Sequence, residues 1–289
     1  DPSLITLQVA RSVDEVKRKA VWEEGPMQAM EKEMACLREN QVFSDVFMTD
    51  VDTCQSPLLN TMMLFSKKFG SKGELLRWKA RFVAKGYMEE KNESYWEVYA
   101  PTTPDSHWRS VVALAASHKW PVLKQADFET AFLKPMLKQI LHIRFPKGMR
   151  QNKVNPATGK EEELVYRLHR ALYGLKGSPK AFSDLVAVEM KELGYHRCWY
   201  DASTYVKWQP KKGHRPTDKD ACTGTNLIAG FPYSGRAMNL DTHDVLIVTS
   251  WVDDLLCAGS NTEMYQEMIE RLNAKKYNLT EGDADFFVG

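Results

Sequence analysis

The sequence lacks several features that would assign a class at once. No apolar run approaches the roughly 20 residues that span a bilayer, and residues 1–4 do not begin a charged-then-apolar signal. The five cysteines are odd in number and form no C-x-x-C pair, so a reduced intracellular protein is the simplest interpretation. The seven histidines show no metal-ligand spacing, and the phosphate-binding pattern G-x-x-x-x-G-K-[ST] is absent.

An excess of either charge is also missing. The 39 basic and 38 acidic residues nearly balance, which argues neither for nor against a nucleic-acid partner. With 289 residues and 43% hydrophobic content, the chain can bury one large or two modest cores. It has no initiating Met, and we therefore expect a segment of a longer polypeptide.

Hydrophobic periodicity and breakers predict a mixture of helices and strands. Helices are expected over residues 12–40, in two pieces broken at Gly25-Pro26, over 105–118 with Asp105 as cap, over 178–193 and over 261–276. Strands are expected in a hairpin over 61–86, over 122–127, 200–208 and 245–259, and at 286–288. Residues 134–166 form a basic region punctuated by Gly and Pro, and residues 209–244 are typical of a long surface loop or a disordered insertion.

The apolar runs 245–248 and 255–258 predict a buried hairpin with Asp253 and Asp254 at its tip. Adjacent carboxylates there are costly unless a cation lies against them, and a divalent ion is the natural choice. An Asp pair is also an ordinary turn former, so the metal hypothesis needs a third carboxylate. Asp127, at the end of the strand 122–127, supplies one if the two strands are neighbours, although its position also suits a helix cap.

A second candidate surface is the strand 78–85. Alternation places Lys79, Arg81 and Lys85 on one face and mostly apolar residues on the other. The cationic face suits phosphate groups, but a solvated edge strand protected by lysine has the same pattern, so both interpretations stay open.

The order of five short segments is more specific than any one of them. The chain reads KARFVAKG, DFETAFL, LYGLKGSPKAF, WVDD and FFVG, in that order. This order resembles the reverse transcriptase segment of copia-type LTR retrotransposon polyproteins. The resemblance runs from about residue 22 to residue 289, with residues 209–244 as an insertion that the family usually lacks.

The resemblance implies an α+β, right-hand polymerase with fingers and palm, in which an antiparallel palm sheet packs on helices and the thumb is absent or truncated. The implied divisions are residues 1–59 as an N-terminal helical extension, 60–100 and 136–177 as fingers, and 101–135 and 178–289 as palm. The last of these includes the insertion and the start of the primer grip.

The resemblance also assigns site residues, position by position. Asp127, Asp253 and Asp254 match the catalytic carboxylates, which with the Phe128 backbone carbonyl would hold two Mg²⁺ ions, with Mn²⁺ as a possible substitute. The positions implied to bind the dNTP are Lys79, Arg81, Lys85, Phe132, Tyr173 and Gly174, among which Phe132 matches the residue that excludes a ribose 2′-OH. The positions implied to touch template or primer are Lys176, Ser178, Pro179, Trp251, Phe287 and Gly289.

The implied function is template-directed DNA synthesis from dNTPs on a primed RNA or DNA template. The implied partners include integrase and RNase H regions of a parent polyprotein and no membrane, and the implied location is a cytoplasmic virus-like particle with a possible nuclear phase. Trp251 stands where the family usually has Tyr, and Gly177 where it usually has Gln. Trp251, the insertion and the missing thumb keep open a decayed or co-opted copy that binds nucleic acid without polymerising. A third, weaker alternative is a palm-type nucleotidyl cyclase.

Overall fold

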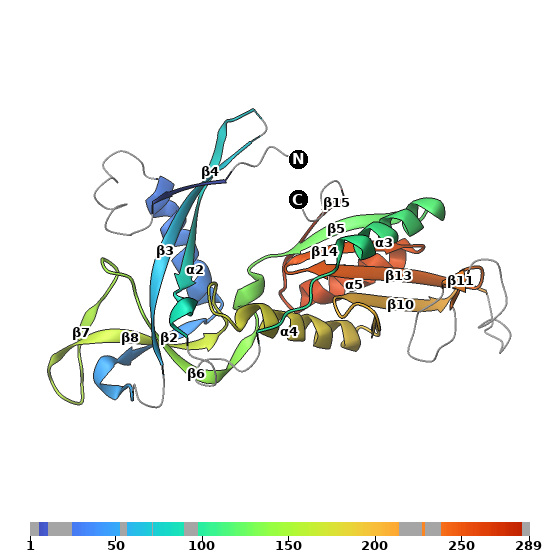
Figure 1. The fold of residues 1–289 in the computed structure, drawn as a ribbon. Coiled ribbons are helices and arrows are strands. Elements are labelled where there is room, and N and C mark those ends of the chain that lie inside the picture. Colours follow the sequence, from blue (N-terminus) through green and yellow to red (C-terminus); the bar gives the residue numbers. More distant parts are fainter. Residues whose placement is uncertain are drawn as a thin grey trace. The chain divides into compact units, whose positions relative to one another are not determined.

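The computed structural model describes residues 6–10, 25–52, 57–70, 72–89, 98–213, 227–228 and 238–284 (Figure 1). The chain divides into two compact units, the first formed by Asp1–Tyr99 and Phe132–Phe182 and the second by Ala100–Ala131 and Ser183–Gly289. Both units combine helices with largely antiparallel sheets, so the α+β class is confirmed. The naming of the units as fingers and palm stays a prediction.

The first unit is built on a seven-stranded sheet in the order β1-β3-β6-β8-β2, with β4 beside β3 and β7 beside β8. Its strands are β1 (Thr6–Ala10), β2 (Phe43–Phe47), β3 (Leu58–Phe69), β4 (Leu75–Ala84), β6 (Met136–Arg144), β7 (Asn152–Val154) and β8 (Glu161–Arg170). The helix α2 (Gly25–Glu39) packs against β4, and the short 3₁₀ turns are η1 (Met48–Asp50), η2 (Gly86–Met88) and η3 (Ala131–Leu133).

Sequence periodicity gave two elements of this unit correctly. The hairpin expected over residues 61–86 is β3 and β4, and its apolar face buries Phe65 and Phe82. The helix expected after residue 25 is α2, which buries Met30, Met34 and Leu37 at helical spacing. The other helical piece, before residue 25, lies outside the described residues.

The N-terminal extension over residues 1–59, expected to be helical, contains α2 and also strands. The strand β2 pairs with β8 in the sheet of the first unit. The Phe43 ring meets the rings of Phe145 and Tyr166 edge-on, each at a centroid distance of 5.3 Å. Aromatic side chains pack well on a pleated surface, which favours a strand here over a helix.

Three further strands, β6, β7 and the first part of β8, lie in the basic region 134–166 and were not expected. Leu141 and Ile143 on β6, and Leu164 and Leu168 on β8, are buried. The buried positions run together at residues 141–143 and 164–166, so the period-two alternation that indicates a strand is absent there.

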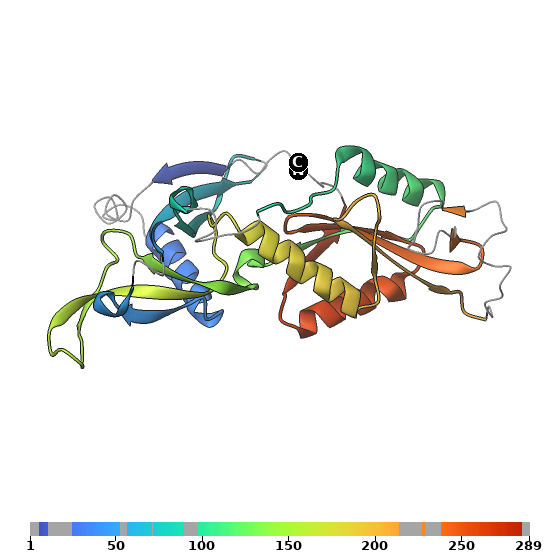
Figure 2. The same ribbon diagram turned by 60° about the horizontal axis from the view of Figure 1, so that its bottom comes forward.

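The second unit contains a six-stranded sheet in the order β15-β5-β14-β13-β10-β9 and a two-stranded ribbon of β11 and β12. Its strands are β5 (Val122–Phe128), β9 (His196–Arg197), β10 (Thr204–Pro210), β11 (Leu227–Ile228), β12 (Met238–Asn239), β13 (His243–Trp251), β14 (Asp254–Gly259) and β15 (Leu279–Asp283). Figure 2 shows α3 (Asp105–Ser117) on one side of the six-stranded sheet and α5 (Thr262–Ala274) on the other.

Two helices, α4 and α5, bury the apolar faces that periodicity predicts. In α4 (Ser178–Glu192) and just after it, Phe182, Val186, Met190 and Leu193 are buried. In α5 the Asn261 side chain accepts the cap hydrogen bond from the Met264 N–H, at 3.1 Å. No helix within the described residues is both long and apolar enough to cross a bilayer.

Three expectations need correction here. Asp105 is not the cap of α3, because the helix is capped at Pro104 and Asp105 lies in its first turn. The strand expected over residues 200–208 begins only at Thr204, and the edge strand β15 was not expected. The loop expected over 209–244 is interrupted by strand residues at both ends and by the β11–β12 ribbon, while residues 214–226 and 229–237 lie outside the described residues.

In the first unit the backbone after β4 lies directly against the segment that precedes α4. The Ala84 N–H donates to the Tyr173 carbonyl at 2.8 Å. A Cβ on Gly86 would lie 1.9 Å from the Gly174 carbonyl oxygen, which is closer than any side chain can come. Glycine at position 86 therefore lets the two segments approach each other.

We predict that Gly86→Ala lowers the free energy of unfolding of the first unit by roughly 1–3 kcal/mol, the usual range for overpacking. The matched control is Gly282→Ala, because a Cβ at Gly282 meets nothing within 4 Å. The control should change stability by less than about 0.5 kcal/mol. Urea denaturation followed by circular dichroism measures both, and equal midpoints for the two variants would contradict the close approach.

Candidate active site

The tip of the β13–β14 hairpin carries two of the candidate carboxylates. The strands pair from Leu246 opposite Gly259 to Trp251 opposite Asp254, which leaves Val252 and Asp253 as the turn. Val252 has a φ of 57°, in the left-handed region that β-branched residues avoid. Such a conformation costs roughly 1–3 kcal/mol and persists only where its surroundings enforce it. The buried strands on either side supply that enforcement.

The third carboxylate arrives through strand pairing. β14 lies beside β5, and Asp127 stands directly opposite Asp254 in the antiparallel ladder. Directly opposed residues project from the same face of a sheet with their Cβ atoms close together. The Phe128 N–H also donates to the Asp253 carbonyl at 3.1 Å, which ties the turn to the end of β5. The expected meeting of Asp127 with the Asp253–Asp254 turn is therefore confirmed, while the catalytic role of these residues stays a prediction.

The electrostatics of the turn favour a bound cation. Asp254 is half-buried, and loss of hydration raises the pKa of its carboxyl, with the neighbouring charge of Asp253 adding to the rise. The Gln125 Nε2 atom lies 3.5 Å from the Asp254 Oδ1 atom and opposes this rise only weakly. No described Lys, Arg or His side chain forms an ion pair with Asp253 or Asp254.

The donor set fits a divalent ion of the Mg²⁺ type in its chemistry. Mg²⁺ prefers oxygen ligands, and it is usually bound by one or two carboxylates together with waters and substrate phosphates. Within the described residues, no three acidic, histidine or cysteine side chains are grouped as a ready-made cage. That grouping is not required for an ion that takes part of its coordination from phosphates. The Phe128 carbonyl lies at the same end of β5, and its part as a ligand stays a prediction.

The first unit brings together three of the residues expected to bind the nucleotide. The Arg81 guanidinium lies over the Tyr173 ring, 5.6 Å from its centroid. The Phe132 ring meets the same Tyr173 ring edge-on at 5.4 Å and the Phe182 ring at 6.2 Å. Aromatic packing on two sides fixes the Phe132 ring in one orientation. The Arg81 guanidinium and the Phe132 ring therefore both pack against the Tyr173 ring.

Lys79 on β4 is the most perturbed base of this surface. Burial, together with the neighbouring charges of Arg81, Lys68 and Arg77, lowers the pKa of Lys79 to about 8. Glu33, whose carboxylate accepts from the Phe82 N–H at 3.0 Å, partly offsets the lowering. A concentration of like charge at one strand is a common property of anion-binding sites. Among the described strands β4 pairs only with β3 and is therefore an edge strand, although Lys79 is half-buried and β4 packs against α2, so both interpretations of this strand stay open.

The remaining template and nucleotide positions of the first unit are mostly engaged by the protein itself. The Lys176 ammonium donates to the Glu89 carbonyl at 2.8 Å, and the Lys176 N–H donates to the Glu89 carboxylate at 2.7 Å. Ser178 is buried, and its hydroxyl donates to the Leu172 carbonyl at 2.6 Å. The contact of Ser178 with template that the resemblance implies stays a prediction. Lys85 and Pro179 are half-buried, and Gly174 is exposed with a φ of 87°.

Two predicted primer positions lie outside the described residues, namely Phe287 and Gly289, together with the strand expected at 286–288. Trp251 is described. It is half-buried and stands opposite Asp254 in the ladder, beside the turn.

A buried carboxylate close to the turn was not expected from the sequence. Asp201 precedes β10 and is surrounded by hydroxyl donors from two segments of the chain. The Nδ1 atom of His107, on α3, lies 3.0 Å from the Asp201 carboxylate. Only a pattern linking residues 103, 107 and 201 could have revealed this contact, and a single sequence does not supply it.

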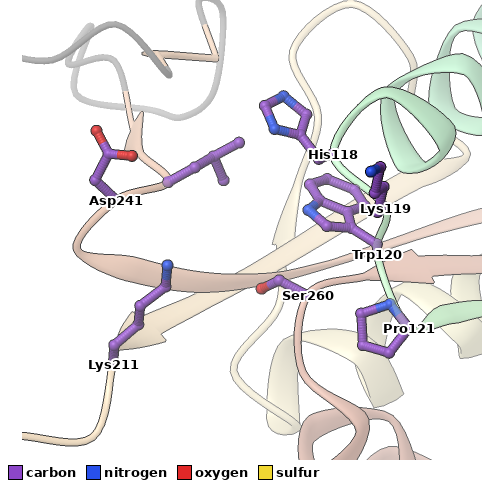
Figure 3. Close-up of a pocket in the computed structure, with 8 residues that line it drawn as sticks. His118, Lys119, Trp120, Pro121, Lys211, Asp241 and Ser260 are labelled. Atoms are coloured by element: carbon purple, nitrogen blue, oxygen red, sulfur yellow. The ribbon is translucent and has the colours of Figure 1, made fainter.

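A cavity of ≈ 320 Å³ in the second unit lies at the other end of the six-stranded sheet (Figure 3). It adjoins the start of β5 and the end of β14, whereas Asp127 and Asp254 occupy the opposite ends of these strands. Its walls are formed by His118, Lys119, Trp120, Pro121, Lys211, Leu240, Asp241 and Ser260. The cavity is therefore separate from the carboxylate turn.

Comparison with known proteins gives a consistent result. A model of the reverse transcriptase (RNA-dependent DNA polymerase) family matches residues 48–213, more than half of the chain. Among curated proteins, the retrovirus-related Pol polyproteins from transposons RE1 and RE2 of Arabidopsis thaliana are 33% and 26% identical over 226 residues. The corresponding polyprotein from transposon TNT 1-94 of Nicotiana tabacum is 30% identical over 181 residues.

These matches cover 78% of the chain for the two Arabidopsis proteins and 63% for the tobacco protein. The chain spans only 13% of the length of each of these relatives. The family match includes β3, β4 and Asp127, and it ends before the β13–β14 hairpin. The chain belongs to the reverse transcriptase (RNA-dependent DNA polymerase) family, as a segment of the copia-type retrotransposon kind.

Proposed function

We propose that the chain carries out template-directed DNA synthesis, transferring nucleotides from dNTPs to a primer 3′-hydroxyl on an RNA or DNA template. The proposal rests on the geometry of the carboxylates. Asp127 pairs with Asp254 in the ladder, beside Asp253, and no described Lys, Arg or His side chain forms an ion pair with Asp253 or Asp254. In this assignment the second unit is the palm and the first unit forms the fingers.

The proposed cofactor is a pair of Mg²⁺ ions, with Mn²⁺ as a substitute. Two bound divalent ions stabilise the charge on the attacking and leaving oxygens of an in-line displacement and lower the pKa of the attacking hydroxyl. Asp127 and Asp253 would hold both ions, with the Phe128 carbonyl contributing at the end of β5. Asp254 is placed at the edge of the site, where its raised pKa and the Gln125 contact suit a supporting role.

The cationic and aromatic residues of the first unit are assigned to the dNTP. Lys79, Arg81 and Lys85 neutralise the β- and γ-phosphates, which affects nucleotide binding before the chemical step. Phe132 excludes a ribose 2′-OH, because that hydroxyl would meet both a rigid ring and a desolvation cost. Its edge-on contacts with Tyr173 and Phe182 hold the ring in place for this purpose.

The proposed macromolecular partner is a primed template held largely through its phosphates. Such binding weakens steeply with salt and carries little sequence preference. Lys176, Pro179 and Trp251 are the described candidates for contacts with template or primer. By likeness to the Pol polyproteins, the chain would act beside integrase and RNase H regions, in a cytoplasmic virus-like particle with a nuclear phase.

A second candidate is a copy that binds nucleic acid without polymerising. Trp251 in place of the usual Tyr, and the insertion over residues 209–244, favour it. The two candidates differ in metal-dependent incorporation of dNTPs and share nucleic-acid binding, so measuring both properties on one preparation separates them.

For the carboxylates, we predict that Asp253→Asn lowers incorporation on poly(rA)/oligo(dT) by more than about a hundredfold, as expected for losing a charge placed for the transition state. The fold should survive, with equal or higher thermal stability, because Asp253 raises the pKa of Asp254 by repulsion. Asp283→Asn is the control, since this exposed carboxylate on β15 pairs only with the exposed Lys124. Retained extension by Asp253→Asn would count against the metal assignment.

For the phosphate-binding strand, we predict that kcat/KM for dNTP falls as pH rises through about 8, because Lys79 then loses its proton in the free enzyme. The rate constant falls rather than rises because a lysine is cationic only below its pKa. Lys79→Arg should remove this fall, because a guanidinium stays charged throughout the range. A pH–rate profile of both proteins decides the point, and superimposable profiles would exclude Lys79 as the titrating group.

For the 2′-OH, we predict that Phe132→Ala reduces discrimination between dNTP and rNTP by roughly 10- to 200-fold, the range for a changed contact in an apolar pocket. Phe132→Tyr keeps the ring and is the matched control. The quantity measured is the ratio of kcat/KM for dATP and ATP. An Ala variant that uses ATP no better than the parent does would refute the exclusion role.

A further inference from the structure

The loop before β10 contains a buried carboxylate, Asp201, that gathers donors from two separate segments. Thr103 Oγ1 donates to Asp201 Oδ2 at 2.9 Å, and Thr204 Oγ1 donates to the same oxygen at 2.6 Å. The Ser203 N–H donates to Asp201 Oδ1 at 2.9 Å, and the Ser203 hydroxyl donates to it as well. The His107 Nδ1 atom lies 3.0 Å from Asp201 Oδ2. Both carboxylate oxygens are therefore satisfied although the residue is buried.

These donors hold Asp201 in its charged form. Burial raises the pKa of Asp201, but the hydrogen bonds from Ser203, Thr204 and Thr103 outweigh burial and leave the pKa below its usual value. Removing one partner from a buried, hydrogen-bonded charge is strongly unfavourable. The arrangement therefore forms a stiff connection between the segment before α3 and the start of β10.

Both sides of this connection reach the same residue of the hairpin, Ser250. The Ser203 carbonyl accepts from the Ser250 N–H at 2.9 Å and from the Ser250 hydroxyl at 3.1 Å. The Thr103 N–H donates to the Ser250 carbonyl at 3.3 Å. Donor, acceptor and hydroxyl of Ser250 are thus all engaged by neighbours that Asp201 fixes. Ser250 pairs with Leu255 in the ladder, one step before Trp251 and Asp254.

We propose that Asp201 is a positioning residue for the carboxylate turn, acting through Ser203 and Thr103 on Ser250 to hold Asp253 and Asp254 in place against Asp127. This proposal rests on the proposed polymerase function for its catalytic consequence. Its structural part stands on the contacts alone.

The turn needs such support for two physical reasons. Val252 is held in a left-handed conformation, and two adjacent carboxylates repel each other at the tip. Both effects favour a shift of the turn away from its ladder position. A misplacement of about 1 Å by a change away from the chemistry can lower a rate by as much as a hundredfold. Holding Ser250 in place, just before the turn, limits that shift.

The test compares Asp201→Asn with Asp244→Asn. Asp244 lies on β13, the strand that carries Ser250, at the end away from the turn, and its oxygens accept from Ser260 at 3.2 Å and from Asn261 at 2.7 Å. Both variants lose charge and hydrogen bonding, but only Asp201 connects to Ser250. Hydrogen exchange of the backbone amides over residues 250–254 is followed in metal-free buffer. We expect exchange there to be about tenfold faster in Asp201→Asn and unchanged in Asp244→Asn.

Steady-state kinetics on poly(rA)/oligo(dT) form the second arm. We expect Asp201→Asn to lower kcat about tenfold and to raise the Mg²⁺ concentration for half-maximal rate severalfold, with KM for dNTP unchanged. A loss of folded protein alone would lower the rate without moving the Mg²⁺ dependence. Asp244→Asn should match the parent in both quantities.

A milder pair of variants keeps the test decisive if Asp201→Asn does not fold. Thr103→Val removes the hydroxyl that donates to Asp201 and keeps the side-chain shape, whereas Thr103→Ser keeps the hydroxyl. The Val variant should show the faster exchange and the altered Mg²⁺ dependence, and the Ser variant should resemble the parent. Equal behaviour of the two would overturn the proposal.

The two arms fail differently. If exchange over 250–254 is unchanged in Asp201→Asn or in Thr103→Val, positioning by Asp201 is wrong whatever the activity. If exchange rises while the parent chain incorporates no dNTP, the positioning holds and the polymerase proposal fails. If exchange rises and an active parent keeps its kcat and Mg²⁺ dependence in both variants, the catalytic part of the proposal is overturned.

Discussion

The register between β5 and β14 is the constraint on which the candidate site depends. Asp127 faces Asp254 only because the neighbouring pair, Ala126 and Leu255, is buried on the other face of the sheet. A slip by one residue would turn Asp127 to the face opposite Asp254, and would turn the buried Ala126 and Phe128 of β5 to the less buried face that carries Asp127. The alternation of buried and half-buried residues along β5 therefore fixes the position of the acidic residues, although apolar side chains take no part in the chemistry.

That fixed register supports features that oppose folding. The raised pKa of Asp254 records both lost hydration and repulsion from Asp253, and Val252 holds a backbone conformation that valine avoids. The ladder from Leu246 to Trp251 compensates for these costs. Functional sites in natural proteins often lower stability in this way, because a charged group that must bind a ligand cannot also be neutralised by the protein.

Local pattern was sufficient for elements whose apolar face is regular and failed where the signal was short or distributed. The β13–β14 hairpin, α2, α4 and α5 follow from spacing alone, and the meeting of Asp127 with Asp254 follows once two buried strands are taken as neighbours. β6 and β8 were not predicted because their buried residues form short runs without a regular alternation, and β15 was not predicted because an exposed edge strand needs little apolar sequence. Asp201 could not be found in this way, since its partners at Thr103 and His107 are distant in sequence.

The two units carry electrostatic perturbations of opposite sign. In the first, burial and neighbouring like charges lower the pKa of Lys79 to about 8, which disfavours its cationic form. In the second, burial and the charge of Asp253 raise the pKa of Asp254, which disfavours its anionic form. A bound anion would relieve the perturbation of Lys79, and a bound cation would relieve that of Asp254. Each unit, taken by itself, therefore favours a ligand of the charge that the proposed function assigns to it.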